Sequence, residues 1–360
     1  MSIYDTIINE DYSWPEPLSE LPLKLDSSMI DKLDPEYVEF FNEVLCYRPD
    51  VLETHKFPVA KTKAGGNVIP GQAPPMEVEK IFDIEIPRKH TKEQGDTTIP
   101  ARVFVPKGEM PKDGWPCTVW FHGGGWVLGG ISTENSYCSH LATLAKCIVI
   151  TVDYRLAPEY PYPACVYDAF ESVLYVMEEG SKLQIDNTKV CVAGSSAGGN
   201  LTAIICHKYA ASPLSKDLPP IKFQMMVVPV TDNSATGETQ KSWKENEKTP
   251  QLPATKMLWF RKIYLPKAGE TLTEPESSPL FYPDESFKNV PPSFIAAGEC
   301  DVLRSEAEAY DAKLRKNGVQ STIHIYKGMP HTAMVMNERL TQGANLVRDT
   351  TSAVRDAFYN

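Results

Sequence analysis

The sequence lacks three features that would each indicate a particular class of protein. No apolar run is long enough to cross a bilayer, so no membrane-spanning segment is expected. Lysine and arginine form no block and the formal net charge is −11, which argues against nucleic acid and anionic membranes as partners. The eight cysteines show no C-x-x-C spacing, which disfavours structural zinc. These absences favour a protein that acts on a small molecule, and the net charge favours a neutral or cationic one.

The N-terminus lacks the basic-then-apolar layout of a signal peptide. Most cysteines fall within apolar runs, as buried free thiols in a reducing compartment do. We therefore expect a cytoplasmic protein. With 360 residues, 42% of them hydrophobic, the chain is long enough for one large α/β domain with an accessory lid, or for two average domains.

The segment Lys189–Asn200 joins a short apolar run to a helix-compatible run through the pattern Gly-x-Ser-x-Gly. This pattern is typical of a nucleophile elbow, a sharp turn that holds a serine hydroxyl above the end of a sheet. Ser196 is the central serine, and Gly194 and Gly198 would let the strand and the helix pass close together. Taken alone, the pentapeptide fits an ordinary turn between a strand and a helix equally well.

A second apolar run, Thr118–Phe121, ends in His122 and three consecutive glycines. Backbone N–H groups free of side-chain bulk can be aimed at the negative charge of a tetrahedral intermediate, as an oxyanion hole requires. We expect the His122 side chain to hold the shape of this loop through a hydrogen bond. The predicted oxyanion-hole donors are the N–H groups of Gly124, together with Gly123 or Gly125, and of Ala197.

Two more candidate groups follow later strand-like runs: Asp301, and His331 within Gly-Met-Pro-His. Imidazole titrates near neutral pH, so His331 is the candidate base for Ser196. A carboxylate would orient the ring and stabilise the imidazolium that forms. Glu299 lies at the same strand end as Asp301, so the residues alone leave the choice between these two carboxylates open.

With these motifs, in the chain order Ser, Asp, His, the sequence resembles the hormone-sensitive-lipase-like family of α/β-hydrolases, the His-Gly-Gly-Gly carboxylesterases. The resemblance covers roughly residues 80 to 340. Asp153–Glu159 and Tyr162–Ala164 match a further signature of the family. Ser195 stands where many members carry an acidic residue, a departure that should tune the site and spare its chemistry.

The family pattern selects Asp301 over Glu299, although Asp301 is followed here by Val302 where members often have proline. The resemblance implies a serine carboxylesterase that needs neither a cofactor nor a metal. The implied catalytic triad is Ser196, Asp301 and His331.

The remaining apolar runs predict a sheet. Eight short strands alternate with helix-length segments from the third strand onward, which predicts a mostly parallel sheet wrapped by helices, with an antiparallel edge formed by the first two strands. The resemblance implies the α/β-hydrolase fold for this sheet. The expected strands are Ile81–Ile86, Ala101–Val105, Cys117–Phe121, Cys147–Val152, Val190–Ala193, Phe223–Val230, Ser293–Ala297 and Thr322–Tyr326.

Two segments interrupt the alternation. Residues 1–76 are proline-rich apart from an amphipathic helix over Ser27–Leu45, and residues 232–288 are polar apart from a helix near Ala254–Tyr264. The resemblance implies that the two segments form a cap over the active site, whereas packing on the outside of the sheet is the alternative for the first helix. The hydrolase core would then occupy residues 77–231 and 289–360. The aromatic residues of the cap fit a pocket wall and ordinary packing equally well: Trp14, Phe40, Phe41, Trp259 and Phe260.

Two further expectations concern a turn and a surface. Asp153, Arg155 and Glu159 are expected to ion-pair with one another and fix a long turn. Members of the family often form homodimers through the last strand and the C-terminal helix, here Met334–Phe358, although this helix could instead pack on its own sheet.

Three functions fit these observations. The leading expectation is a hydrolase of carboxylic esters with small to medium acyl chains, acting through an acyl-enzyme intermediate. An amide, lactone or deacetylating hydrolase of a specific metabolite would use the same triad. A non-catalytic receptor on the same fold is disfavoured, because the plant hormone receptor of this family has lost the histidine that His331 supplies here.

Overall fold

The centre of the molecule is one eight-stranded sheet, in which every predicted strand is present with its ends shifted by a few residues. The strand order is β1-β2-β4-β3-β5-β6-β7-β8. β2 runs antiparallel to both of its neighbours, and the other six strands of this order, β4, β3, β5, β6, β7 and β8, run parallel to one another. The computed structural model describes residues 18–64, 69–92, 97–265 and 269–360. The strands are β1 (Lys80–Ile86), β2 (Ile99–Val105), β3 (Trp115–Phe121), β4 (Ile148–Val152), β5 (Ile185–Ser195), β6 (Phe223–Val227), β7 (Ser293–Gly298) and β8 (Ser321–Tyr326).

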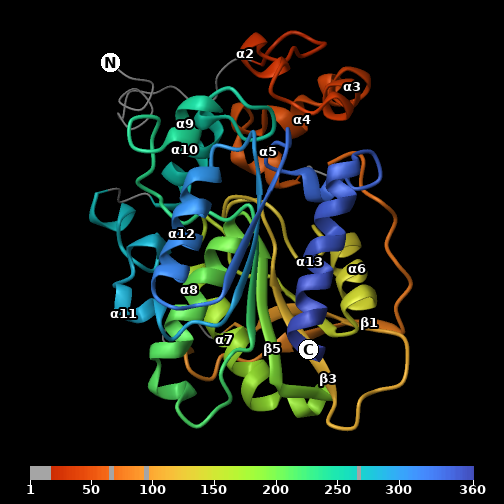
Figure 1. The fold of residues 1–360 in the computed structure, drawn as a ribbon, viewed down its shortest axis with the longest axis vertical. Helices are drawn as coiled ribbons and strands as arrows, with labels where there is room; N and C mark the ends of the chain where they lie inside the picture. The colour runs from red at the N-terminus through yellow and green to blue at the C-terminus, as the bar shows by residue number, and fades with distance from the viewer. Residues whose placement is uncertain (1–17, 65–68, 93–96, 266–268) are drawn as a thin grey trace.

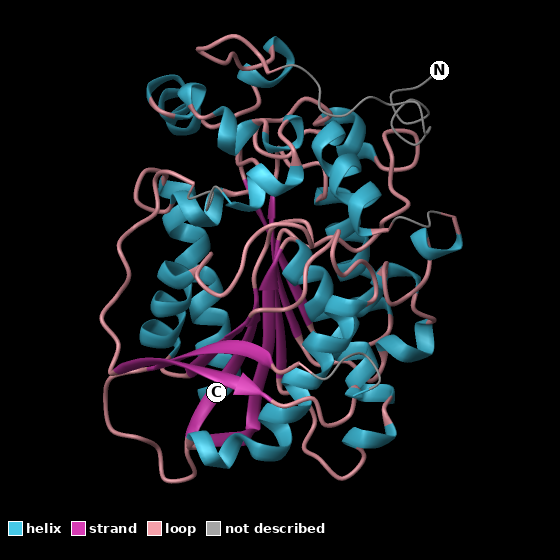
Figure 2. Cartoon of the chain, turned by 180° about the vertical axis from the view of Figure 1, so that it is seen from behind, coloured by secondary structure: helices cyan, strands magenta, loops and turns pink. Residues whose placement is uncertain are grey.

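Both faces of the sheet are apolar, and both are covered by helices. In β3, Val119 and Phe121 join one buried cluster and Trp120 joins the other, because successive side chains of a strand point to opposite faces. Figure 1 shows the two helical layers on either side of the sheet, and Figure 2 shows the same layers from behind. One layer contains α7 (Ala164–Glu179), α8 (Ala197–Ala211) and α12 (Arg304–Lys316), and the other contains α6 (Asn135–Ala145) and α13 (Thr341–Tyr359).

The predicted sixth strand ends earlier than expected. It was predicted to reach Val230, but β6 stops at Val227. Val228 takes a left-handed backbone conformation with φ of 43°, and its N–H donates to the carbonyl of Ala296 at 2.7 Å. The backbone therefore turns out of the sheet at this point.

The prediction of a single helix over Ser27–Leu45 is wrong. Pro35 divides this stretch, because proline has no N–H to continue a helix and fits only in its first turn. Asp34 caps the second helix by accepting a hydrogen bond from the N–H of Glu36. The helices of the N-terminal segment are α2 (Ser27–Ile30), α3 (Pro35–Glu43), α4 (Pro49–Leu52) and α5 (Val59–Ala64).

The second interrupting segment contains the predicted helix with the predicted bounds. Figure 1 shows α10 lying together with the N-terminal helices at one end of the sheet. The N-terminal helices, α9 and α10 are distant in the sequence, but all lie beyond the carboxyl ends of the central strands, whereas α11 lies on the flank beside α8 and α12. The helices between β6 and β7 are α9 (Lys241–Glu245), α10 (Ala254–Tyr264) and α11 (Asp284–Phe287).

The C-terminal helix packs on its own domain. It begins at Thr341, later than predicted, because a short 3-10 helix occupies Ala333–Met336. Leu346 and Val354 are buried in the same cluster as α6, and the Tyr137 hydroxyl donates to Thr350 Oγ1 at 2.8 Å. This packing is the alternative stated above, and a homodimer through this region stays a prediction.

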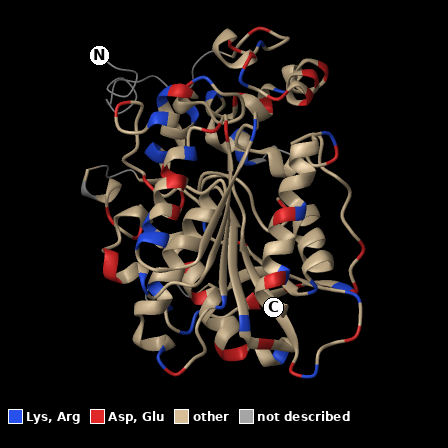
Figure 3. Ribbon diagram, in the orientation of Figure 1, with Lys and Arg blue, Asp and Glu red and all other residues tan. Residues whose placement is uncertain are grey.

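The distribution of cysteine and charge follows the layers. All eight cysteines are buried and unpaired, as predicted for free thiols. Figure 3 shows Lys and Arg interspersed with Asp and Glu over the outer helices, while the central strands carry few charges. Within the described ranges, no helix is both long and apolar enough to cross a membrane.

Candidate active site

Ser196 lies at the tip of the turn between β5 and α8. β5 ends at Ser195 and α8 begins at Ala197, so a single residue joins them. Ser196 takes a φ of 53° and a ψ of −114°, a conformation that is strained for a side chain other than glycine. Its N–H donates to the carbonyl of Val227 on β6 at 2.8 Å. The turn is thereby fixed with the serine hydroxyl at its tip.

The glycines around Ser196 are required by close backbone contacts, as the sequence predicted. A Cβ atom at position 198 would lie 1.8 Å from the carbonyl oxygen of Phe121, and one at position 194 would lie 2.4 Å from the carbonyl oxygen of Gly198. Both contacts are far inside van der Waals distance and involve rigid backbone. Gly194 and Gly198 therefore allow the helix to pack directly against the ends of β3 and β5.

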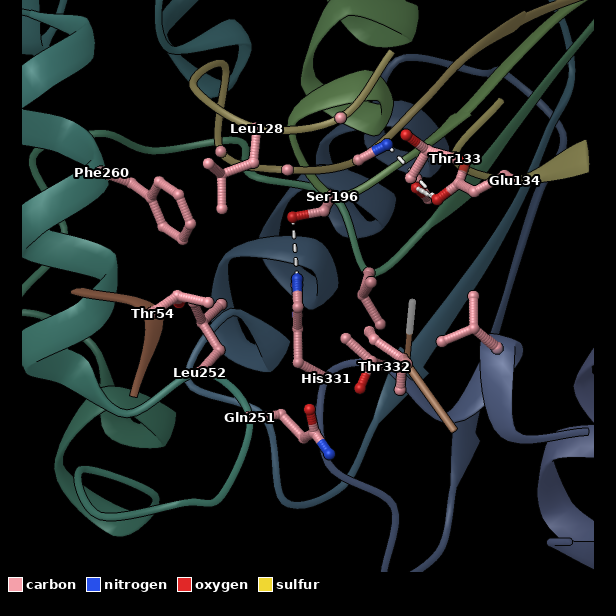
Figure 4. Close-up of a pocket in the computed structure, with 18 of the residues that line it drawn as sticks. Thr54, Leu128, Thr133, Glu134, Ser196, Gln251, Leu252, Phe260, His331 and Thr332 are labelled. Carbon is pink, nitrogen blue, oxygen red and sulfur yellow. Dashed lines mark hydrogen bonds between the residues drawn. The ribbon is translucent and has the colours of Figure 1, made fainter. Parts of the chain in front are cut away.

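The structure brings Ser196, His331 and Asp301 together. His331 Nε2 lies 2.8 Å from Ser196 Oγ, and His331 Nδ1 lies 2.7 Å from Asp301 Oδ2. Figure 4 shows the hydrogen bond between His331 and Ser196 at the centre of a pocket. Both the histidine and the aspartate are buried. The three side chains follow β5, β8 and β7, so the carboxyl edge of one parallel sheet positions all of them.

Glu299, the other carboxylate considered from the sequence, faces elsewhere. Its Oε1 pairs with Lys327 Nζ at 2.8 Å, and its Oε2 accepts a hydrogen bond from the N–H of Gly328 at 2.9 Å. These contacts tie Glu299 to the turn after β8. The geometry therefore favours Asp301 as the partner of His331.

The glycine loop after β3 presents two unused N–H groups. Gly124 and Gly125 have φ values of 120° and 60°, and within the described chain neither N–H donates to a protein acceptor. Ala197 is the first residue of α8, so its N–H has no acceptor inside the helix. The N–H of Gly123 differs, because it points to Glu134 Oε1 at 3.4 Å. Of the four candidate donors, Gly124, Gly125 and Ala197 are therefore available to a ligand.

His122 holds the loop in place, as predicted. Its Nδ1 lies 2.7 Å from the carbonyl oxygen of Gly123, and its ring stacks on Tyr154 at 4.3 Å between centroids. The Tyr154 hydroxyl donates to the His122 carbonyl at 2.7 Å. Burial lowers the pKa of His122 to about 4, so the ring is neutral at physiological pH.

Glu134 is a buried acidic residue that the sequence analysis did not find. Its Oε1 accepts a hydrogen bond from Ser195 Oγ at 2.6 Å, and its Oε2 accepts one from Trp120 Nε1 at 2.6 Å. Burial raises the pKa of this carboxyl above its ordinary value. Glu134 thus places an acidic group beside Ser195, the position at which the family resemblance implies an acidic side chain. Ser195 marks a departure from the family pattern, but the sequence does not indicate which acidic residue lies beside it.

The predicted ion pairs among Asp153, Arg155 and Glu159 are wrong. Arg155 pairs with Asp168 of α7, with its Nη2 2.8 Å from Asp168 Oδ1. Glu159 pairs with Lys63 of the N-terminal segment. The turn is therefore fixed from outside, because α7 and the N-terminal segment present charges that lie closer than those within the motif.

The nucleophile opens into a cavity of about 630 Å³. Figure 4 shows Thr54, Gln251, Leu252 and Phe260 in the wall around Ser196 and His331. Phe260 lines this cavity, whereas Phe40, Phe41 and Trp259 are buried in the core, and Trp14 lies outside the described residues. The wall residues from the two interrupting segments are Val51, Thr54, Thr62, Lys63, Ile69, Gln72, Gln251, Leu252, Lys256, Met257 and Phe260.

In the part of the chain that the structure describes, His, Cys, Asp and Glu side chains form no group of three or more suited to hold a metal ion. The groups described above at the cavity are suited to proton transfer and to hydrogen bonding.

Comparisons with known proteins identify the family and the fold. A family model described as alpha/beta hydrolase fold matches residues 118–335. The AB hydrolase superfamily protein C1039.03 of Schizosaccharomyces pombe is 52% identical over 340 residues, which cover 94% of this chain and 98% of the relative. Carboxylesterase NlhH of Mycobacterium tuberculosis is 32% identical over 79% of this chain and 89% of its own length. The solved esterase of Pyrobaculum calidifontis, 28% identical, superposes with a TM-score of 0.74 over 90% of this chain and 98% of its own.

Proposed function

Because the chain belongs to the hormone-sensitive-lipase-like family of α/β-hydrolases, we propose that it is a serine hydrolase of carboxylic esters with small to medium acyl chains. The observation that carries this proposal is the position of the His331 ring, within hydrogen-bond distance of Ser196 Oγ on one side and of Asp301 Oδ2 on the other. A nucleophile, a base and an orienting carboxylate in this order are what acyl transfer requires.

In the proposed reaction, Ser196 Oγ attacks the ester carbonyl while His331 Nε2 takes the hydroxyl proton. Asp301 holds the ring in the tautomer that presents an unprotonated Nε2 and stabilises the imidazolium. The imidazolium then gives its proton to the leaving alcohol. Water, deprotonated in turn by His331, attacks the acyl-enzyme and releases the acid and Ser196.

The negative charge of each tetrahedral intermediate is assigned to the N–H groups of Gly124, Gly125 and Ala197. These donors come from backbone, so they are in place before the substrate binds and cost no reorganisation during the reaction. The N-terminus of α8 adds positive potential at the same point. Gly123 is given a supporting role, since its N–H faces Glu134.

We assign the wall of the cavity to a cap built from residues 1–76 and 232–288. Within the described part of these segments, Val51, Thr54, Leu252 and Phe260 line the cavity that contains Ser196. An apolar wall accommodates an acyl chain, and exclusion of water strengthens the electrostatics of the site. The cap would therefore decide which esters are cleaved.

The test is a hydrolysis panel of p-nitrophenyl esters from acetate to palmitate, beside matched p-nitroanilides and lactones. The proposal predicts turnover of the shorter esters and little turnover of the anilides. Faster cleavage of an anilide or a lactone would replace the ester assignment with one of these. Absence of any turnover, together with tight binding of a small molecule, would favour a receptor.

A further inference from the structure

A buried lysine lies in the wall of the cavity. Lys256 belongs to α10, is 6% exposed as a whole residue, and lines the cavity together with Met257 and Phe260 of the same helix. Its Nζ donates to the backbone carbonyl of Val51 at 2.8 Å. A protonated lysine has three donors, so this contact uses one of them.

Lys256 has no anionic partner within ion-pair distance among the described residues. Glu53 is the acidic group whose charge acts on it, but the Glu53 carboxylate is bound to Lys56 at 2.8 Å and to the N–H of Ser19 at 3.0 Å. Burial lowers the pKa of Lys256 to about 7, because an unpaired ammonium is costly away from water. An anion entering the cavity would stabilise the charged form.

A second lysine of the cavity differs in this respect. Lys63 also lines it, but its Nζ is paired with Glu159 and lies 3.3 Å from the carbonyl oxygen of Ala157. Its charge is therefore already balanced within the protein. Of the two lysines that line the cavity in the described part of the chain, Lys256 is therefore the one whose charge remains for a ligand.

Thr54 supplies an independent observation at the same wall. The residue is 3% exposed, and its Oγ1 has no hydrogen-bond partner in the described structure. Leaving a buried hydroxyl unpaired is unfavourable, so such a group is expected to find a hydrogen-bond partner in a ligand. Thr54 lies three residues after Val51, whose carbonyl accepts from Lys256, and Figure 4 shows it in the pocket wall.

The position along α10 indicates where a bound group would lie. A Cβ atom at Gly125 would lie 2.3 Å from the ring of Phe260, so this ring packs directly against the glycine loop. Lys256 is four residues earlier on the helix, which corresponds to a rise of about 6 Å. Lys256 is thus about one helical turn away from the loop that faces the reacting carbonyl.

We propose that Lys256 and Thr54 bind a carboxylate at the far end of the substrate, so that the preferred substrates are short esters with an anionic group remote from the scissile bond. This inference rests on the proposed esterase function and adds a substrate class to it. The net charge of the chain favoured a neutral or cationic substrate, but the charge that a bound group meets is set by the cavity wall.

The first experiment compares p-nitrophenyl hydrogen adipate with p-nitrophenyl hexanoate, which has an acyl chain of the same length without the carboxylate. A second pair, 4-carboxyphenyl hexanoate and phenyl hexanoate, places the carboxylate on the alcohol side. The readout is the ratio of kcat/KM for the charged ester to that for the neutral ester, with the difference expected in KM. A ratio above one in either pair is expected for the native protein.

Two variants and one control locate the effect. Lys256→Met and Thr54→Val should each lower the ratio, by about tenfold for the lysine, which is the value of one hydrogen bond to a charged group. Lys63→Met is the matched control from the same cavity, and its ratio should stay within about twofold of the native value. If Lys256→Met does not fold, Thr54→Val still tests the site.

The failures of the two proposals are distinguishable. If both neutral esters are hydrolysed and neither charged ester is preferred, the carboxylate site is overturned and the esterase function stands. The carboxylate site would also be overturned if p-nitrophenyl methyl adipate, which lacks the negative charge, had the same kcat/KM as p-nitrophenyl hydrogen adipate. If no ester is hydrolysed, the proposed esterase function fails. The carboxylate site is then tested by labelling of Ser196: the rate with a fluorophosphonate that carries a terminal carboxylate is compared with the rate for its methyl ester. A rate ratio of one would overturn it.

Discussion

The catalytic edge of the sheet and the cavity wall opposite it are built in different ways. At the edge, Ser196, His331 and Asp301 contact one another, and each follows a strand of the same sheet. At the wall, the side chains come from two segments distant in sequence, and Thr54 has no hydrogen-bond partner in the described structure. The three catalytic side chains are paired with one another without a ligand, whereas the wall leaves polar side chains for a ligand to satisfy.

This difference separates two properties of the proposed enzyme. A preorganised edge supplies the chemistry, since its dipoles and hydrogen bonds need no rearrangement. The wall supplies selectivity, since its groups contact the parts of the substrate that do not react. Changes at the edge should therefore reduce turnover of every substrate, and changes at the wall should reorder the substrates.

The largest effect is expected from Ser196→Ala. Loss of the nucleophile should reduce turnover on the order of a thousandfold or more for every ester, because no neighbouring group can replace its hydroxyl. Steady-state hydrolysis of p-nitrophenyl butyrate measures this, and the melting temperature checks the fold. Ser195→Ala is the control and should do far less, since its Oγ is bonded to Glu134. A larger loss for Ser195→Ala would mean that the nucleophile is misplaced by one residue.

Asp301→Asn should follow, with a loss on the order of a hundredfold or more. An amide donates where a carboxylate accepts, so it favours the wrong tautomer of His331. The loss should appear in kcat for all esters. Glu299→Gln is the matched control and should be milder, because Glu299 contacts Lys327 and Gly328. The opposite ranking would assign the orienting carboxylate to Glu299.

At the wall, Phe260→Ala should change the order of substrates. Phe260 lines the cavity, whereas its neighbour Trp259 is buried in the core. Both truncations should cost about 3 to 5 kcal/mol of unfolding free energy. Only Phe260→Ala should shift the chain-length profile toward bulkier acyl groups, measured with the p-nitrophenyl ester panel. An equal shift for Trp259→Ala would show that the profile reports general loosening of the protein.

The smallest effect is expected on stability, where the segment that follows β6 packs against α12. Glu306 of α12 accepts hydrogen bonds from the N–H of Thr231 at 2.8 Å and from Trp243 Nε1 at 3.1 Å. Burial, with the nearby charge of Asp232, raises the pKa of Glu306 from 4.5 to about 8. The folded protein thus keeps a proton that the unfolded chain releases. This contribution to stability is present below pH 4.5 and is lost as the pH rises through about 8.

Glu306→Gln should therefore flatten the dependence of unfolding free energy on pH between these values, by about 1.4 kcal/mol per pH unit. Urea unfolding at several pH values measures the slope. Glu308→Gln, a change at a more exposed glutamate of the same helix, should leave the slope as it is in the native protein. If the two variants have the same slope, Glu306 is ionised in the folded state.

The edge was largely predictable from the sequence, because local rules determine it. Strand periodicity identified all eight strands. The glycines around Ser196 identified the turn, because the close approach of the backbone to Phe121 leaves no room for a side chain at position 198. The resemblance to a family selected Asp301, and the observed contact with His331 agrees with that choice. Each of these features depends on residues within one short stretch or on strand ends that a parallel sheet must bring together.

The wall and the support behind the edge were not predictable, because they depend on contacts between distant segments. Glu134 lies 61 residues before Ser195, and nothing in its local sequence indicates that its carboxyl accepts a hydrogen bond from the Ser195 hydroxyl. Arg155 pairs with Asp168 of α7 because the fold places them together. Lys256 was expected only as part of an amphipathic helix, and its burial became evident from the packing of α10 on the N-terminal segment.

Covalent labelling with a fluorophosphonate, followed by peptide mapping, tests most directly whether Ser196 is an activated nucleophile. A single label on Ser196 is expected in the native protein, with the same label in Ser195→Ala and a strongly reduced labelling rate in His331→Ala. A label on Ser195, or no label on a correctly folded protein, would contradict the account.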